Sequence, residues 1–485
     1  MNYAVLNYAS RNKDELMMNM YRMGMNSIER GNKDTWSLSP SKVDEMNRLY
    51  QDSLKKRPGA TAGNIPVRFY DSVMKNPAYK DPRGYILPSD QPDFPTAVEF
   101  LNALIRTGVV VQRAKNEFTV AGKKYPAGSY IVKTNQAFRP HILDLFEPQD
   151  HPNDFQYPGG PPVPPYDAAG WTLAYQMGVQ FDRIMDALDG PFETSPRGEL
   201  LKITGSASNS AKGYLLDARA NQSYKAANLL LSKGMEVFRV KGGENNGSFY
   251  VAPGNRSKAV IDEIVKQSGA VFRSATQKPS SLERIHKARI ALWDTYGGSM
   301  PSGWTRLIFE KFNFDYDVIY PKTIDSGNLK DRYDVIVFVG GAIPSINGRN
   351  TFNADRRSDS LIPAEFKYMT GRINAETSIP QLKTFIEQGG KVVTIGSSTQ
   401  LAYHLKLPVT DAMTEIENGV DDFQQVAARG VDLVELFGLL GADAGASHQV
   451  RHAGDGVEWR ADLVAHVGQK GALGAAGRFG GLLGL

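Results

Sequence analysis

The 485-residue chain has 41% hydrophobic and 22% charged residues, which is typical of a globular protein large enough to hold several cores. Lys and Arg number 56 against 52 Asp and Glu, and the net charge of +4 is spread without the basic runs that mark nucleic-acid binding. The lack of cysteine excludes disulfides, thiolate metal sites and cysteine nucleophiles, and no stretch approaches the about 20 apolar residues of a membrane span.

Residues 1–80 are predicted to be helical. Apolar side chains such as Leu16 and Met20 recur among charged residues at helical spacing, without the basic lead and apolar core of an export signal. A second helix is predicted over residues 43–54, with Ser41 as its cap and a Pro-Gly break after it. Because the helical pattern starts at the first residue, we expect this region to be a linker that follows a further domain.

Residues 81–195 change to a strand, helix, strand pattern. The predicted strands cover residues 84–87, 109–111, 118–120 and 130–132. Between the first two strands, residues 96–106 place their apolar side chains on one face of a helix. The last two strands flank a glycine-bounded turn, which predicts that they pair as a hairpin.

Residues 196–280 repeat this pattern. The predicted strands cover residues 212–216, 234–238 and 249–251, and the predicted helices cover 226–232 and 257–266. Gly84 and Gly213 both open a Gly-Tyr-apolar-Leu strand, so we interpret the two regions as copies of one α/β unit. The proline-rich stretch 157–166 is predicted to be a stiff connector, with peptide docking as the alternative.

Residues 281–418 are predicted to form a separate α/β domain. Its predicted strands include Ile290, Val318, Val335 and Val392, and its predicted helices cover residues 302–312 and 379–388. Near-continuous apolar strands that alternate with helices indicate a parallel sheet covered on both faces. We therefore expect these four strands to lie side by side in a flavodoxin-like or class I glutamine amidotransferase-like domain.

Residues 419–485 differ in composition from the rest of the chain. They are rich in Gly and Ala, and after residue 430 they contain no Pro, Ile, Tyr, Thr or Asn. Such a shift is typical of a segment of different origin. We assign this tail no function and expect truncation near Gly419 to leave the α/β units folded.

The densest group of candidate metal ligands contains His141, Asp144, Asp150 and His151. Imidazole and carboxylate groups suit zinc or a hard cation, but neighbouring prolines are expected to interrupt any single helix that carries them, so the alternative is a solvated acidic loop. A carboxypeptidase-type zinc centre needs a His with a Glu three residues later, and none of the seven His residues has one. We therefore expect no cofactor in this chain.

Candidate ligand-binding residues in 281–418 follow directly after predicted strands: Gly297, Gly340, Gly341 and Ser397. Parallel sheets bind ligands at the carboxyl ends of their strands, although tight turns explain the glycines equally well. Ser397 occupies the place where amidotransferase-like folds carry their nucleophile, with His404 as the nearest candidate base. The alternative is that Ser397 or Ser398 caps the following helix.

Four blocks of sequence carry a family resemblance: residues 82–88, 137–141, 147–152 and 169–178. With these blocks, residues 2–419 resemble large secreted bacterial zinc carboxypeptidases of the carboxypeptidase A-like family. The resemblance implies that a catalytic zinc domain comes first and that α/β units and an amidotransferase-like domain follow it. The family's zinc ligands and general-base Glu belong to that first domain, and no position here corresponds to them.

The resemblance therefore implies an accessory, non-catalytic portion of a periplasmic or secreted protein. This portion would pack against an upstream carboxypeptidase domain or present peptide substrate to it, and zinc would belong only to that domain. The alternative is an independent hydrolase or amidotransferase-like enzyme that uses residues 281–418. Without cysteine or a complete catalytic relay, the sequence favours the accessory role.

Overall fold

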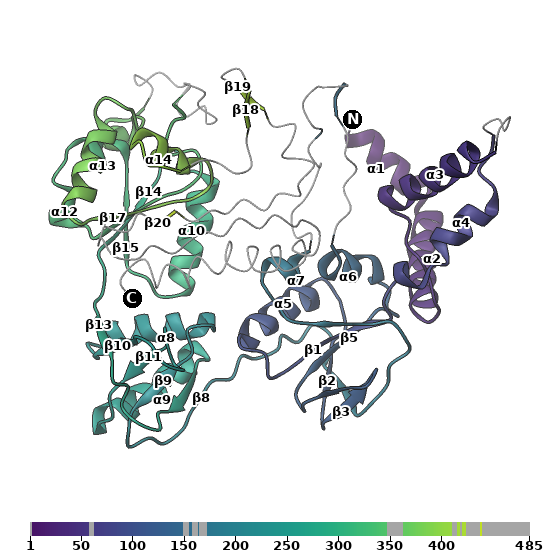
Figure 1. Ribbon diagram of the computed structural model, residues 1–485, viewed down its shortest axis with the longest axis horizontal. Helices are drawn as coiled ribbons and strands as arrows, with labels where there is room; N and C mark the ends of the chain where they lie inside the picture. The colour runs from purple at the N-terminus through teal and green to yellow at the C-terminus, as the bar shows by residue number, and fades with distance from the viewer. Residues whose placement is uncertain are drawn as a thin grey trace. The chain divides into compact units, whose positions relative to one another are not determined.

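The computed structural model describes residues 2–57, 63–148, 155–157, 163, 172–346 and 362–409, together with the short strands β18 (Glu415–Glu417), β19 (Val420–Asp422) and β20 (Phe437–Gly438). The described residues fall into two compact units, which divide between Lys202 and Ile203 (Figure 1). Most of the predicted connector at 157–166 and most of the tail lie outside the described residues.

The N-terminal region is helical, as predicted. It contains α1 (Asn2–Arg11), α2 (Lys13–Gly31), α3 (Pro40–Lys55), α4 (Val67–Met74) and the short helix η1 (Pro77–Tyr79). Helix α3 begins earlier than expected, because Pro40 occupies the first turn, where no backbone N–H is needed. The N-cap is therefore Ser39 and not Ser41.

The first α/β repeat follows these helices. Its elements are β1 (Gly84–Leu87), α5 (Phe94–Arg106), β2 (Gln112–Ala114), β3 (Phe118–Val120), β4 (Lys123–Tyr125), β5 (Tyr130–Lys133), α6 (Arg139–Phe146), α7 (Leu173–Gln176), β6 (Asp182–Ile184) and β7 (Phe192–Thr194). The strands form an antiparallel sheet in the order β6-β1-β5-β2-β7. Buried side chains such as Ile86 and Ile131 form its core.

The predicted hairpin in this repeat is wrong. Strand β3 pairs with β4 and not with β5, around a two-residue turn at Ala121 and Gly122. Both turn residues have positive φ, 49° and 79°, as the tight turns of two-residue hairpins require. Strand β5 is left to pair with β1 and β2 in the main sheet.

The second α/β repeat begins the second unit. Its elements are β8 (Ser206–Ala207), β9 (Tyr214–Leu216), α8 (Asn221–Ser232), β10 (Val237–Val240), β11 (Phe249–Val251), α9 (Asn255–Ser268), β12 (Val271–Ser274) and β13 (Leu282–Ile285). The sheet order is β13-β10-β11-β9-β12-β8, and only the β12–β8 pair is parallel.

The two repeats share one topology. In the first sheet the order is β6-β1-β5-β2-β7, and in the second the corresponding strands stand in the order β12-β9-β11-β10-β13. The strands correspond one to one along the chain, and every equivalent pair is antiparallel. This is the topology that a duplicated α/β unit is expected to have. The first repeat differs by the inserted β3–β4 hairpin.

A parallel sheet completes the second unit. Its elements are β14 (Ile290–Trp293), α10 (Met300–Lys311), β15 (Tyr316–Ile319), α11 (Pro321–Asp325), α12 (Leu329–Arg332), β16 (Val335–Phe338), η3 (Ala364–Met369), α13 (Ser378–Glu387), β17 (Lys391–Thr394), η4 (Gly396–Gln400) and α14 (Leu401–His404). Strands β15, β14, β16 and β17 lie side by side and parallel, which confirms the prediction. All residues of β14 and β16 are buried.

The edge of this sheet carries one further short strand. Strand β20, from the compositionally distinct tail, pairs antiparallel with β17. The second repeat and the parallel sheet share a single hydrophobic core, which includes residues from Tyr214 to Leu401. The mixed α/β class predicted from the sequence is therefore confirmed.

Candidate functional site

The carboxyl edge of the parallel sheet is the place where the sequence predicts ligand binding. The chain runs from β14 to β15 on one side and then returns to β16 on the other side of β14. At such a switch point two loops diverge, and α/β sheets bind ligands in the space between them. Here these are the loops that follow β14 and β16.

Asp294 organises the loop that follows β14. It is 2% exposed, and its Oδ1 accepts hydrogen bonds from the backbone N–H groups of Thr295 at 2.8 Å and Ser299 at 2.9 Å. Its Oδ2 forms an ion pair with Arg306 of α10. Among the residues that the structure describes, the buried Nε of Arg306 has no partner. The two oxygens of Asp294 are thus used by the loop and by Arg306 of α10, which suits a structural role.

The glycines of the two loops have backbone conformations that favour glycine. Gly297 and Gly341 have φ of +83° and +87°. A Cβ at Gly297 would meet open space, so conformation and not crowding requires this glycine. Of the two interpretations that the sequence left open, a tight turn accounts for both positions.

Ser397 and Ser398 fasten the loop after β16. The Oγ of Ser397 accepts a hydrogen bond from the N–H of Gly341 at 2.8 Å. The Oγ of Ser398 is buried, accepts from the N–H groups of Ala342 and Ile343 at 3.2 Å each and donates to the carbonyl of Val339. The predicted helix-capping role is wrong, because the N-cap of the following helix η4 is Ile395 and no side chain caps it, whereas both hydroxyl groups accept from amides of the loop after β16.

The structure brings Gly340, Gly341 and Ser397 together, but the described residues form no catalytic relay around the serine. A Cβ at Gly340 would lie 3.9 Å from the Oγ of Ser397. The ring Nε2 of His404 lies 2.8 Å from the carbonyl oxygen of Pro344, whereas the hydroxyl of Ser397 bonds to the Gly341 amide. An activated serine needs a base within hydrogen-bonding distance. Each side chain instead has a backbone partner.

The candidate metal ligands lie on or beyond helix α6. His141 Nε2 is 2.9 Å from the hydroxyl of Thr107, and Asp144 is exposed. Asp150 and His151 lie outside the described residues. Pro140 lies in the first turn of α6 and leaves the helix intact, but the helix ends at Phe146, before Pro148, so it carries His141 and Asp144 only. Within the described part of the chain, no group of three or more His, Asp or Glu side chains could hold a metal ion.

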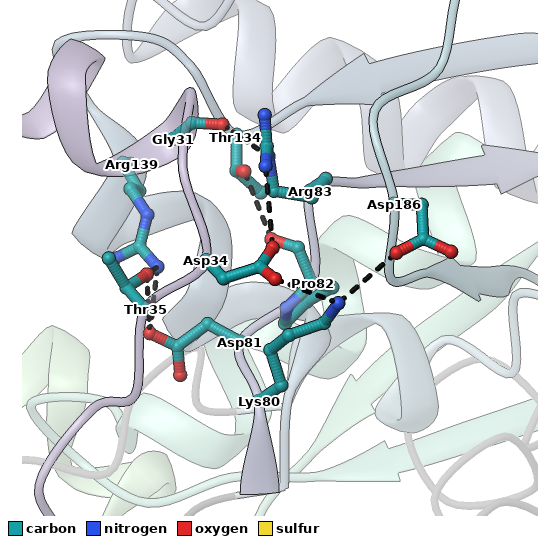
Figure 2. Close-up of polar contacts among 10 residues, drawn as sticks. All are labelled: Gly31, Asp34, Thr35, Lys80, Asp81, Pro82, Arg83, Thr134, Arg139 and Asp186. Atoms are coloured by element: carbon teal, nitrogen blue, oxygen red, sulfur yellow. Dashed lines mark hydrogen bonds and ion pairs between the residues drawn. The ribbon is translucent and has the colours of Figure 1, made fainter. Parts of the chain in front are cut away.

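A buried polar cluster, which the sequence did not predict, joins the helical region to the first repeat. Figure 2 shows Arg139 of α6 directed at Asp81 and Thr35. The Arg139–Asp81 ion pair is 2.8 Å long, and the two side chains are only 6% and 9% exposed. Asp81 also accepts hydrogen bonds from the backbone N–H and the hydroxyl of Ser37.

A second set of contacts in Figure 2 fixes the C-terminal end of α2. Lys80 lies 3.4 Å from Asp34 and 3.1 Å from Asp186, and Arg83 donates to the carbonyl of Gly31 at 2.8 Å. A Cβ at Gly31 would lie 2.3 Å from the Cα of Asn135. Only glycine permits this close approach, so the end of α2 is held directly against the first repeat.

Beyond this anchored end, helices α1 and α2 expose many apolar side chains. Every residue of α1 is exposed, and in α2 only Gly31 is buried. We call the following set the apolar helix surface: Tyr3, Val5, Leu6, Tyr8, Leu16, Met17, Met18, Met20, Tyr21, Met23 and Met25. Surfaces of this kind mark interaction sites, and flexible methionines adapt well to a partner. No helix among the described residues is long and apolar enough to cross a membrane.

The comparisons with known proteins give no relative. No family model, no curated protein and no solved structure matches this chain. Two features of the structure bear on function. One is the pair of loops at the carboxyl edge of the parallel sheet, whose polar groups bond within the fold, and the other is the anchored, apolar helices of the N-terminal region.

Proposed function

We propose that this chain is an accessory, non-catalytic portion of a zinc carboxypeptidase-family protein, which packs against a carboxypeptidase domain or presents peptide substrate to it. The observation that carries the proposal is the apolar helix surface. Exposed side chains such as Tyr3, Met20 and Met23, which are 88%, 71% and 68% exposed, gain free energy when a partner covers them. The gain is about 25 cal/mol per Å² of apolar area removed from water.

The anchoring of α2 also supports this role. Arg83 and Lys80 hold its C-terminal end, and Gly31 permits close packing there. Anchoring limits the motion of the helix and of its apolar residues, which lowers the entropy lost when a partner binds. A typical stable interface buries about 800 Å² on each partner, an area that two helices of this length can supply.

The family resemblance points to the kind of partner. Two of the blocks that carry it contain Arg83 and Arg139, and these side chains form the polar cluster that holds α2 and the chain after it. The resemblance assigns the zinc ligands and the general base to a separate domain. A periplasmic or secreted location belongs to the same proposal.

The parallel sheet supports a finer assignment of residues 281–418. Numbered along the chain, its four parallel strands stand in the order 2-1-3-4, which is the order of flavodoxin-like folds. We include in the proposal that this domain is flavodoxin-like or class I glutamine amidotransferase-like. Its candidate nucleophile Ser397 bonds to a backbone amide, so a packing role suits the domain better than catalysis.

A binding measurement tests the proposal. A carboxypeptidase A-like zinc domain of this bacterial family, produced separately, is titrated with the full chain in a calorimeter. The double variant Met20→Asp/Met23→Asp is expected to bind at least about tenfold more weakly, since charges replace interface side chains. The matched control is Met300→Asp/Leu307→Asp, which changes two apolar residues of α10 that are 76% and 51% exposed.

Two results would contradict this role. The unaltered chain would fail to bind the zinc domain, or both double variants would weaken binding equally. Circular dichroism of each variant shows whether its helices are retained, so that a loss of binding is separated from a loss of folding.

A further inference from the structure

The first repeat contains a cavity at the end of its sheet, and none of the predicted candidate residues lines it. Its volume is about 300 Å³, and its lining residues are Arg113, Ala114, Lys115, Ala127, Gly128 and Glu193. This volume is at the lower end of small-molecule sites, which suits a group of amino-acid size. The lining combines two cations with one carboxylate, so the cavity has one positive charge in excess.

The strand register explains how these charges come together. Arg113 of β2 lies opposite Tyr130 of β5 on one side and opposite Glu193 of β7 on the other. Lys115 is two residues further along, where side chains return to the same face, and its ammonium group lies 3.9 Å from the Glu193 carboxylate. Both partners of this ion pair are more than half exposed, so water screens the attraction between them.

Of the charged groups that line the cavity, the guanidinium of Arg113 is the one that can bind a ligand. Its side chain is exposed and forms no hydrogen bond or ion pair with any other residue in the described ranges. Gly128 closes the neighbouring turn with φ of +84°, and its N–H donates to the carbonyl of Ala114 at 2.8 Å. A Cβ at Gly128 would lie 3.5 Å from Nη2 of Arg113, so the guanidinium lies beside the turn.

The second repeat contains the same arrangement with a different outcome. Arg239 lies opposite Phe249 and Glu283, and Lys241 forms an ion pair with Glu283. However, the Arg239 guanidinium lies over the rings of Phe249 and Tyr224, 4.8 and 5.9 Å from their centroids. The duplicated arginine is thus covered by aromatic side chains in the second repeat and open to a cavity in the first.

We propose that the cavity at Arg113 binds a carboxylate group. The planar guanidinium matches the two oxygens of a carboxylate with parallel hydrogen bonds. The single excess positive charge balances one negative charge and leaves the second charge of a phosphate unbalanced. This inference goes beyond the packing role of α1 and α2, and neither depends on the other.

Titration of the full chain with small ions tests the proposal. The only charged group of N-acetylglycine is a carboxylate and that of glycinamide is an ammonium group, whereas inorganic phosphate carries more than one negative charge. We expect N-acetylglycine to bind more tightly than the other two. Arg113→Gln is expected to weaken this binding at least about tenfold, the usual effect of removing a charged hydrogen-bonding partner. Arg106→Gln, at the exposed end of α5, is the matched control and is expected to bind as the unaltered chain does.

Two peptide arms identify the source of the carboxylate. A tetra-alanine peptide is compared with its C-terminally amidated form and with an amidated peptide that contains one Glu. Loss of binding on amidation assigns the site to a chain terminus, and retention with the Glu peptide assigns it to an acidic side chain. Equal binding by Arg113→Gln and the unaltered chain, or preferential binding of phosphate, would overturn the proposal. Melting temperatures of both variants show that each remains folded.

Discussion

The two α/β repeats have the same strand order but use equivalent positions differently. In the first repeat, Arg139 at the start of α6 reaches outside the sheet to Asp81 and thereby holds the helical region. In the second, Ser257 near the start of α9 bonds locally to the carbonyl of Ala252 at 3.1 Å. The two repeats therefore share their strand order, whereas their side chains differ in what they contact. Some bond within their own repeat, and others bond to a neighbouring region of the chain.

The arginines of β2 and β10 give the same contrast. Arg239 contributes to the packing of its own repeat, whereas Arg113 lines a cavity. Strand pairing depends on hydrogen bonds of the backbone, so the two repeats keep one strand order although their side chains differ. Side chains at the edge of the sheet can then diverge at little cost in stability.

The largest difference is expected when an ion pair of each repeat is broken. Arg139→Met leaves the buried carboxylate of Asp81 without its charged partner, which is expected to cost about 3–5 kcal/mol of unfolding free energy. Arg219→Met removes the exposed partner of Asp217 in the second repeat and is expected to cost about 0–1 kcal/mol. Urea denaturation followed by circular dichroism measures both changes.

A second substitution isolates the unpaired charge as the cause. Adding Asp81→Asn to Arg139→Met removes the buried negative charge and should restore part of the lost stability. Equal effects of Arg139→Met and Arg219→Met would show that the two repeats do not differ in this way.

The next difference concerns the paired arginines of the two sheets. Arg239→Gln removes a cation from the faces of two aromatic rings and is expected to lower the unfolding free energy by about 1 kcal/mol. Arg113→Gln changes an exposed residue and is expected to alter stability by less than about 0.5 kcal/mol. Thermal denaturation measures both changes. A larger loss of stability for Arg113→Gln than for Arg239→Gln would contradict the claim that Arg239 stabilises its repeat and Arg113 does not.

A smaller difference between the repeats is expected in how their stability changes at acid pH. Burial raises the pKa of Asp217, but the hydrogen bonds and charge of Arg219 outweigh it and hold the net pKa below its ordinary value. Because the folded-state pKa is depressed, this contribution is present above the unfolded pKa of about 3.9 and is lost as the pH falls through the folded value. The equivalent place after β1 in the first repeat is Pro88, which does not titrate.

The corresponding measurement is the unfolding free energy between about pH 6 and pH 2. The unaltered chain should lose stability on acidification, and Asp217→Asn should lose less over the same range. Parallel pH curves for the two proteins would show that the Asp217 pair contributes nothing to acid sensitivity.

The smallest effect is expected from metal removal. The described residues of neither repeat bring three suitable ligands together, so dialysis against a chelator is expected to leave the melting temperature unchanged. The same preparation should contain no stoichiometric zinc and should not release C-terminal residues from peptides. One tightly bound zinc per chain with chelator-sensitive hydrolysis would contradict the non-catalytic role.

Much of the local structure could be predicted from the sequence because it depends on local patterns. The apolar strand that contains Val335 and the amphipathic spacing of α5 each lie within a few residues of their predicted bounds. The hairpin failed because the Gly122–Gly128 segment looks like one turn. The chain instead places the short strand β4 inside it, and positive φ at Ala121 was not visible in the residue type.

The site features that the sequence missed depend on distant pairings. Asp81 and Arg139 are 58 residues apart, and no local sequence pattern predicts that they form a buried ion pair. The predicted capping role of Ser398 was also wrong, because its partners Ala342 and Ile343 lie in the loop after the neighbouring strand β16. Exposure of the α2 methionines could not be predicted either, since the same spacing is typical of a buried face.

Hydrogen–deuterium exchange in the presence of the separately produced zinc domain tests the central claim most directly. The account predicts slower exchange in residues 2–31, which form α1 and α2, when the zinc domain is bound. It also predicts unchanged exchange in the parallel strands β14 and β16. Protection confined to the carboxyl edge of that sheet, or no protection in α1 and α2 at saturating zinc domain, would contradict the claim that the apolar helix surface is where the peptidase domain packs.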